Sequence, residues 1–229
     1  MQELTPEDCD RRMEYGELML GRHEDWPKIF ENILWSDETV FHIGGFVIRH
    51  NCHYWAAHEF EVTVEKKQNR PKVTVWCGMT ATRVIGPYLL RDIMNAERYL
   101  QMLEDYAWPI ISDWENIDEL VFMHDGASPH FAPGVRSWLD QKFPGRWLER
   151  RGPHEWPARS PELTPFDFFL WGWTKEGVYR EKSHTLEKLE DRIREVITNV
   201  PHDFLQKTAD SIPGCLRKLV DVVGAYVEF

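Results

Sequence analysis

The sequence predicts a mixed α/β fold in which a single sheet is flanked by helices. Three observations lead to this prediction. The first part of the chain is dominated by β-branched and aromatic runs, the middle alternates short apolar runs with helical periodicity, and the last part is helical. With 229 residues, of which 42% are hydrophobic, the chain can bury a substantial core within one domain. No internal repeat is visible, which argues against a solenoid.

The strands expected in the first half are runs of β-branched and aromatic residues: residues 33–43, 46–50, 72–79 and 88–90. Gly44-Gly45 predicts a hairpin turn between the first two runs, and Gly86-Pro87 predicts a turn before the fourth. A helix over residues 5–20 precedes the strands, because Thr5-Pro6 is a typical helix start and acidic residues follow it.

The second half is expected to supply further strands and most of the helices. Residues 120–125 form a buried strand stopped by Gly126, and residues 147–148 form a brief one. The helices have apolar residues at helical spacing or begin at capping residues: Asn95 to about residue 110, residues 133–143, the stretch from Thr164-Pro165, and residue 185 onward. The last stretch should break at Pro201 and again at residues 212–214.

Tryptophan, cysteine and histidine usage favours an apolar core without disulfides or structural zinc. The tryptophans inside predicted strands and helices are assigned to core packing: Trp35, Trp76, Trp138, Trp147, Trp156, Trp171 and Trp173. The four cysteines lie far apart, so we expect neither a disulfide framework nor a zinc ribbon. One local group of potential ligands lacks the spacing of a closed zinc site: His50, Cys52, His53 and His58.

The net charge of −11 does not favour an autonomous DNA-binding module, since phosphate neutralisation supplies most of the affinity of such modules. Two local basic stretches are interpreted as solvated surface: Lys66, Lys67, Arg70 and Lys72, and then Arg146, Arg150, Arg151 and Arg159. No run of 18 apolar residues and no signal-peptide core is present, so a soluble intracellular protein with no membrane partner is expected.

Three aspartates occupy positions where an acidic side chain is unusual. Asp37 lies in the middle of an apolar strand, where a buried carboxylate is costly unless it is paired or binds a metal. Asp125 ends a buried strand, which is where open α/β sheets build their sites. Asp167 lies in the first turn of a helix. Each also has a structural explanation: Asp37 could face solvent, Asp125-Gly126 is a common turn, and Asp167 could complete a capping box.

Together the three acids have the chemistry of a site for hard divalent cations. Mg²⁺, or Mn²⁺ in its place, binds a few carboxylate oxygens and retains water, so carboxylates on separate elements suit it. Two such ions about 4 Å apart can activate an attacking oxygen and stabilise a leaving 3′ oxygen in phosphoryl transfer. We therefore expect Asp37, Asp125 and Asp167 to be the metal ligands and the catalytic residues, with two ions bound.

Three ordered sequence blocks contain these acids and resemble the signature blocks of mariner-type transposases. They are residues 35–39 (WSDET), residues 124–130 (HDGASPH) and residues 156–167 (WPARSPELTPFD). In that family the third acid follows the SPDL-x-P stretch by two positions, which corresponds to Asp167 here. The helical end of the chain is similar as well, so the resemblance covers nearly the whole length.

The resemblance implies a ribonuclease H-like fold with a helical C-terminal tail and a triad of Asp37, Asp125 and Asp167. It implies a linker helix over residues 1–30 and a catalytic domain over residues 31–229, without the family's N-terminal helix-turn-helix modules. The activity implied is metal-dependent cleavage of DNA strands at transposon ends and transfer to target DNA. A homodimer and a nuclear location are implied too.

The sequence departs from the family pattern at several positions. In the second block Gly126 replaces an asparagine and Ser128 replaces an arginine, which removes a possible phosphate contact. In the third block Glu162 replaces an aspartate outside the triad. The interval between Asp125 and Asp167 is longer than in the best-known members.

Residues beside the triad are given supporting roles. The resemblance implies that His124 supports the strand end, and neither His124 nor His130 is expected to bind metal directly. Glu38 should point to the opposite face from Asp37 by strand alternation. Arg151 and Arg159 could contact the DNA backbone. Two other functions remain open: a domesticated derivative that binds DNA or protein without catalysis, and a free-standing ribonuclease H-like nuclease that cuts without joining.

Overall fold

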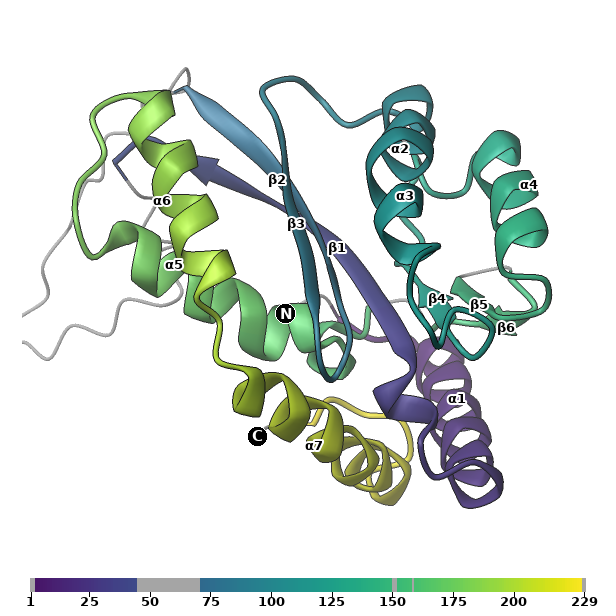
Figure 1. Cartoon of the computed structure of the whole chain (residues 1–229). Helices are drawn as coiled ribbons and strands as arrows, with labels where there is room; N and C mark the ends of the chain where they lie inside the picture. Colours follow the sequence, from purple (N-terminus) through teal and green to yellow (C-terminus); the bar gives the residue numbers. More distant parts are fainter. Residues whose placement is uncertain (1–2, 45–70, 150–151, 158, 228–229) are drawn as a thin grey trace, which may run out of the picture.

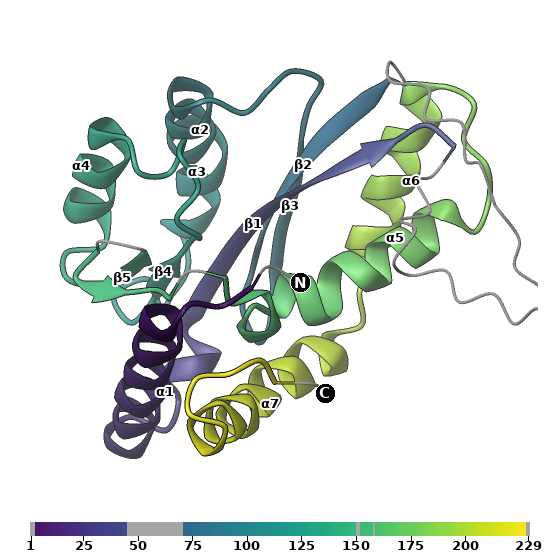
Figure 2. The ribbon, with the colours of Figure 1, turned by 180° about the vertical axis from the view of Figure 1, so that it is seen from behind.

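The computed structural model describes residues 3–44, 71–149, 152–157 and 159–227. A six-stranded sheet with the order β3-β2-β1-β4-β5-β6 forms its centre (Figure 1). The helices α2, α3 and α4 lie on one side of the sheet, while α5 and α6 lie on the other (Figure 1). The first and last helices, α1 and α7, pack side by side below the sheet, as both views show (Figures 1 and 2).

The strands are β1 (Ile33–His42), β2 (Lys72–Met79), β3 (Val84–Leu90), β4 (Val121–Met123), β5 (Trp147–Glu149) and β6 (His154–Glu155). The first three pair antiparallel, and β1, β4, β5 and β6 pair parallel, which confirms the predicted mixed sheet. The predicted return strand at residues 46–50 lies outside the described residues, as do the four potential zinc ligands. The same holds for the first basic stretch except Lys72, and for Arg150 and Arg151 of the second.

The helices are α1 (Pro6–Asp25), α2 (Ala96–Met102), α3 (Trp108–Ile111), α4 (Pro133–Lys142), α5 (Trp171–Tyr179), α6 (Leu186–Thr198) and α7 (His202–Asp221). A π-helical turn at Leu103–Ala107 joins α2 to α3, and another at Phe166–Leu170 precedes α5. The predicted caps are present, since the side chains of Thr5, Asn95 and Thr185 accept backbone N–H groups.

The turn predicted at Gly86-Pro87 is wrong, because both residues lie inside β3. The chain reverses earlier, where the Thr80 N–H donates to the Arg83 carbonyl at 2.9 Å. Gly86 has a φ of +114° at the point where the β2–β3 register shifts. A glycine inside a strand often marks such a bulge. The Gly86-Pro87 pair therefore indicates an irregularity within β3 and not the boundary of a strand.

The break predicted at residues 212–214 is also wrong, because α7 runs through Pro213 without interruption. A proline removes one helical hydrogen bond, but packing can compensate for that loss. The buried face of α7 carries Leu205, Ile212, Leu216 and Leu219, which join the main core. The break predicted at Pro201 is confirmed, since α6 ends at Thr198 and α7 begins at His202.

The apolar core forms two clusters, one on each face of the sheet. The larger includes residues from α1, α5, α6 and α7, and the smaller lies under α2, α3 and α4. Six of the seven tryptophans assigned to the core are buried: Trp35, Trp76, Trp138, Trp147, Trp156 and Trp171. Trp173 is partly buried against the larger cluster. Within the part of the chain that the structure describes, no helix is long and apolar enough to cross a membrane.

Two glycines of α5 should respond oppositely to replacement by alanine. A Cβ at Gly177 would lie 2.9 Å from two methyl carbons of Val196 on α6, whereas a Cβ at Gly172 meets nothing within 4 Å. We expect Gly177→Ala to lower the free energy of unfolding by about 1–2 kcal/mol through overpacking. We expect Gly172→Ala to raise it by about 0.5–1 kcal/mol because the helix gains a better former. Urea denaturation of both variants measures these changes in the free energy of unfolding. Equal changes in the two variants would contradict the close packing of Gly177 against α6.

Candidate metal centre

Asp37 and Glu38 project from the middle of β1 to opposite faces of the sheet, as strand alternation predicts. Asp37 pairs in register with Cys77, which belongs to the larger cluster, and Glu38 pairs with Trp76, which belongs to the smaller one. The Asp37 carboxylate accepts a hydrogen bond from the indole N–H of Trp171 at 2.7 Å. Asp37 therefore faces α5, and Glu38 faces the layer of α2 and α4.

Asp125 lies two positions beyond the end of β4, next to the middle of β1. The parallel pairing of β4 with β1 places Met123 opposite Trp35, so Asp125 emerges close to the level of Asp37. The Asp125 carboxylate accepts the backbone N–H of Ala127 at 3.0 Å and lies 2.7 Å from Nδ1 of His130. The Asx-type turn anticipated for Asp125-Gly126 is thus present, and it leaves the carboxylate at the strand end.

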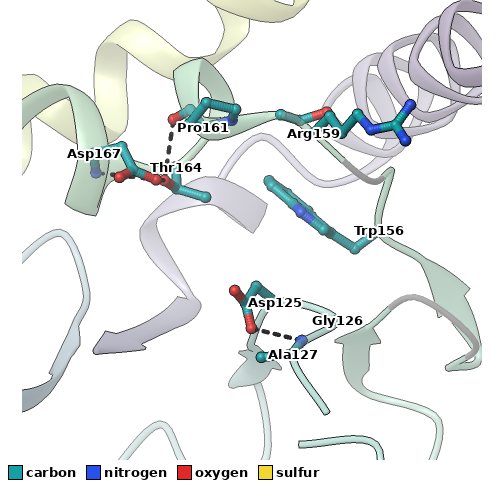
Figure 3. A pocket seen from close by; sticks show the side chains of 9 residues that line it. Asp125, Gly126, Ala127, Trp156, Arg159, Pro161, Thr164 and Asp167 are labelled. Atoms are coloured by element: carbon teal, nitrogen blue, oxygen red, sulfur yellow. Dashed lines mark hydrogen bonds between the residues drawn. The ribbon is translucent and has the colours of Figure 1, made fainter. Parts of the chain in front are cut away.

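Asp167 lies in the π-helical turn before α5. The Thr164 hydroxyl donates to the Asp167 carboxylate at 2.6 Å, and the Asp167 N–H approaches the same hydroxyl at 3.4 Å. The two side chains are thus tied together, but the capping box considered for Asp167 is not formed, because the Thr164 N–H donates to Pro161 and the helix start at Pro165 has no side-chain cap. Asp167 and Asp125 also face a common cavity of about 360 Å³, whose wall includes Trp156 and Arg159 (Figure 3).

The three carboxylates lie close enough to influence one another's pKa. The pKa of Asp37 is raised to about 8, mainly by burial; the hydrogen bond from Trp171 opposes this rise, and the charges of Glu38, Asp167 and Asp125 contribute to it. Burial also raises the pKa of Asp167; Thr164 and Lys175 oppose this rise, and the charge of Asp125 adds to it. Repulsion of this kind is relieved when a cation binds between the carboxylates.

Each carboxylate has a protein hydrogen-bond donor as its partner. Within the described residues, no three acidic, histidine or cysteine side chains already converge as a set of metal ligands. Asp125 and Asp167 line the cavity, whereas Asp37 is held beside it by Trp171. The donor set still fits a hard divalent cation, because it consists of carboxylate oxygens from three separate elements whose negative charges are close enough to shift one another's pKa.

His130 links two acids from different strands. Its ring is 1% exposed, with Nδ1 at 2.7 Å from Asp125 and Nε2 at 3.1 Å from Glu38. Burial opposes the charged form, but Glu38 and Asp125 raise the pKa of His130 well above its ordinary value. Burial alone would raise the pKa of Asp125. The hydrogen bond from His130 and the positive charge of its ring instead lower this pKa below its ordinary value. His130 thus keeps Asp125 ionised and fixes its orientation.

His124 has a structural environment. It is fully buried; Nδ1 lies 3.2 Å from the Tyr99 hydroxyl, and the ring stacks on His130 at 4.9 Å. Burial and the charge of His130 lower the pKa of His124 well below its ordinary value. This position suits the supporting role that was expected of the histidine before Asp125.

Sequence reasoning missed two residues that organise the site, Trp171 and Arg12. Trp171 had been assigned to the core, although its spacing of four from Asp167 on one helix could have indicated a shared face. Arg12 of α1 is fully buried and donates to Ser160, to the Arg159 carbonyl and to Glu162. It also donates to the carbonyl groups of residues 224 and 225 near the C-terminus.

Arg12 therefore ties the loop before Asp167 to the first helix and to the end of the chain. From the second basic stretch, Arg146 was interpreted as solvated surface, but it donates to the carbonyl groups of Ile117 and Leu120 at 3.0 and 2.5 Å. Its role is to hold the segment that leads into β4.

Comparison with known proteins identifies relatives by sequence. The chain is 24% identical over 224 residues to the Tc3 transposase of Caenorhabditis elegans, a match that covers 96% of this chain and 63% of that protein. It is 23% identical over 211 residues to the Tcb1 transposase of Caenorhabditis briggsae, covering 89% and 72%. No protein-family model matches the chain. The chain thus spans less than two thirds of the Tc3 transposase.

Solved structures of the Mos1 mariner transposase share the fold. The Mos1 catalytic domain determined with raltegravir and Mn superposes with a TM-score of 0.78 at 20% identity, over 100% of both chains. The pre-cleavage Mos1 transpososome gives a TM-score of 0.82 at 21% identity, over 99% of this chain and 66% of that one. The ribonuclease H-like fold is confirmed. The chain is related in sequence to the Tc3 and Tcb1 transposases, and its fold is that of the mariner transposase catalytic domain.

Proposed function

We propose that this chain is the metal-dependent catalytic domain of a DNA transposase, which cleaves DNA strands and transfers a 3′ hydroxyl to a new phosphodiester. The observation that carries the proposal is geometric: Asp125, after β4, and Asp167, in the turn before α5, line one cavity, and Trp171 holds Asp37 of β1 beside it. Relatives named as transposases and the shared fold of the Mos1 catalytic domain support it.

The proposed cofactor is Mg²⁺ or Mn²⁺, with two ions held by Asp37, Asp125 and Asp167. Mos1 structures that contain Mn or Mg support the choice of a divalent cation. Bound ions would supply Lewis-acid stabilisation to the attacking and leaving oxygens of phosphoryl transfer. The chain's own residues bind and orient: Trp171 directs the Asp37 carboxylate, and His130 directs that of Asp125.

The proposed partners are transposon-end DNA and target DNA, and Mos1 complexes with a transposon end support this class of ligand. We propose a homodimer and a nuclear location on the same resemblance. The net charge of −11 favours a second candidate, a derivative that no longer catalyses, because the 38 acidic residues outnumber the 27 basic ones and oppose the binding of phosphates.

Calorimetric titration with Mn²⁺ tests the proposal directly. The wild-type chain should bind Mn²⁺, and both Asp37→Ala and Asp125→Ala should abolish binding, because each removes a ligand of one site. Nicking of a labelled duplex by the wild type in Mg²⁺ or Mn²⁺ would then establish the chemistry. An Mn²⁺ affinity that neither substitution changes would refute the metal centre. Mn²⁺ binding without nicking of the duplex would favour the non-catalytic derivative.

Trp171→Phe should shift the pH dependence of Mn²⁺ binding upward. The Trp171 N–H stabilises the ionised form of Asp37, whose pKa is raised to about 8, so removing it raises that pKa further. Binding requires the ionised carboxylate, and affinity should therefore increase with rising pH and level off at a higher pH in the variant. Titrations between pH 6 and 9 measure this. Trp173→Phe, two positions along α5, is the control and should leave the profile unchanged.

A further inference from the structure

The cavity beside the carboxylates has one basic residue on its wall. Among the described residues that line it, Arg159 alone carries a positive charge, next to Ser160 and Pro161 and across from Asp125. The side chain of Arg159 is 38% exposed. A cation at the mouth of an acidic cavity is placed where the backbone of a bound nucleic acid would enter.

The backbone of Arg159 is held in an unusual conformation. Its φ is +57°, a left-handed value that non-glycine residues seldom adopt. The buried Arg12 guanidinium fixes this conformation by donating to the Arg159 carbonyl at 3.0 Å and to the Ser160 hydroxyl at 2.8 Å. Backbone strain of this kind clusters at functional sites, where the surrounding structure maintains it. The backbone of Arg159 is therefore held in place, while its side chain is free to change rotamer.

The Arg159 guanidinium is turned away from the cavity and toward α1, where it pairs with Asp8 (Figure 3). Asp8 does not depend on this pairing, because its carboxylate also accepts the Thr5 N–H at 2.9 Å and the Thr5 hydroxyl at 2.7 Å. When Arg159 leaves, the capping box of α1 keeps Asp8 hydrogen-bonded. Release of the arginine therefore exposes no unsatisfied carboxylate.

We propose that Arg159 binds a backbone phosphate of DNA at the mouth of the carboxylate cavity, and that Asp8 competes with the phosphate for this side chain. The inference rests on the proposed function for the identity of the ligand. A phosphodiester accepts the planar fork of an arginine as a carboxylate does, so one partner can replace the other. Within the described lining of this cavity, Arg159 is the one side chain that could attract a phosphate by its charge.

The test measures binding of a fluorescein-labelled nicked duplex to the full chain in Ca²⁺, which replaces Mg²⁺ to limit cleavage, over a series of salt concentrations. Arg159→Gln should weaken binding by about fivefold and reduce the slope of log affinity against log salt by about 0.9, the value for one lost phosphate contact. Asp8→Asn should strengthen binding by about fivefold, because Arg159 is no longer held by a charged partner.

Glu7→Gln is the matched control for Asp8→Asn. It removes the same charge from the adjacent position and breaks one of the two ion pairs of Arg11, but Arg11 does not line the cavity. We expect less than about a twofold change in affinity, since a distant charge in solvent is largely screened. In the double variant Asp8→Asn/Arg159→Gln, affinity should return to that of Arg159→Gln alone.

Two outcomes would overturn the inference: unchanged affinity and salt slope in Arg159→Gln, or a gain from Asp8→Asn that persists in the double variant. If no variant binds the duplex, Arg159 makes no phosphate contact and the inference also fails. Failure here leaves the Mn²⁺ titrations of Asp37→Ala and Asp125→Ala unaffected, so it is distinguishable from failure of the proposed function. Thermal melting of each variant verifies that the fold is retained.

Discussion

Asp125→Asn should reduce metal-dependent DNA cleavage by roughly a thousandfold or more, because it removes a charged ligand from the proposed metal centre. Asparagine has the same size and can still accept the Ala127 N–H, so the turn after β4 should persist. The amide is a weaker ligand, and it also lacks the charge that pairs with the His130 imidazolium. Cleavage of a labelled nicked duplex under single-turnover conditions measures the loss.

Asp118→Asn is the control for this variant. Asp118 is exposed and precedes β4, at the opposite end of the strand from Asp125. We expect a change in cleavage rate of less than about twofold, since an exposed charge distant from the site is screened. Retention of cleavage in Asp125→Asn, with the protein freshly purified and nuclease-free, would exclude the proposed role of Asp125.

Arg12→Met should lower the free energy of unfolding by about 3–5 kcal/mol, the usual cost of removing one partner from a buried ion pair. The guanidinium is fully buried, and its removal leaves Glu162 and the carbonyl groups of Gly224 and Ala225 without this donor. Methionine preserves much of the volume of the side chain, so the loss reflects hydrogen bonds and charge more than a cavity. Chemical denaturation followed by tryptophan fluorescence measures it.

Arg11→Met is the matched control, one position earlier on the same helix. Arg11 is 43% exposed, and its partner Glu7 is 75% exposed, so the pair should contribute less than about 1 kcal/mol. A similar loss of stability in both variants would show that the hydrogen bonds of the buried Arg12 contribute no more to stability than the exposed ion pair of Arg11. A large loss confined to Arg12→Met would support its role in tying the loop before Asp167 to α1.

Local patterns were sufficient to predict most elements of the fold. Strand periodicity placed Asp37 and Glu38 on opposite faces, and capping chemistry placed helix starts at Thr5 and Asn95. The errors arose where tertiary packing overrides a local signal. Pro213 stays inside α7 because the apolar face of that helix is buried, and Gly86 serves a bulge inside β3.

The connections within the site could not be predicted in the same way. Trp171 lies 134 positions from Asp37, and Arg12 lies 150 positions from Glu162. Contacts across such separations leave no periodic signature, so a single sequence shows a tryptophan or an arginine without its partner. The placement of the three aspartates as ligands remains a prediction, which the Mn²⁺ titrations address.

The hydrogen bond between Arg12 and Gly224 spans 212 positions, and this separation affects the order in which parts of the chain become fixed during folding. The loop that precedes Asp167 is locked by an arginine from the first helix, yet that arginine completes its hydrogen bonds with carbonyl groups from the last few residues. Contacts between distant segments form late because closing a long loop costs entropy. We therefore expect the loop before Asp167 to become rigid late in folding, when residues 224 and 225 dock on Arg12, so the arrangement of the three aspartates depends on a contact far from them in sequence.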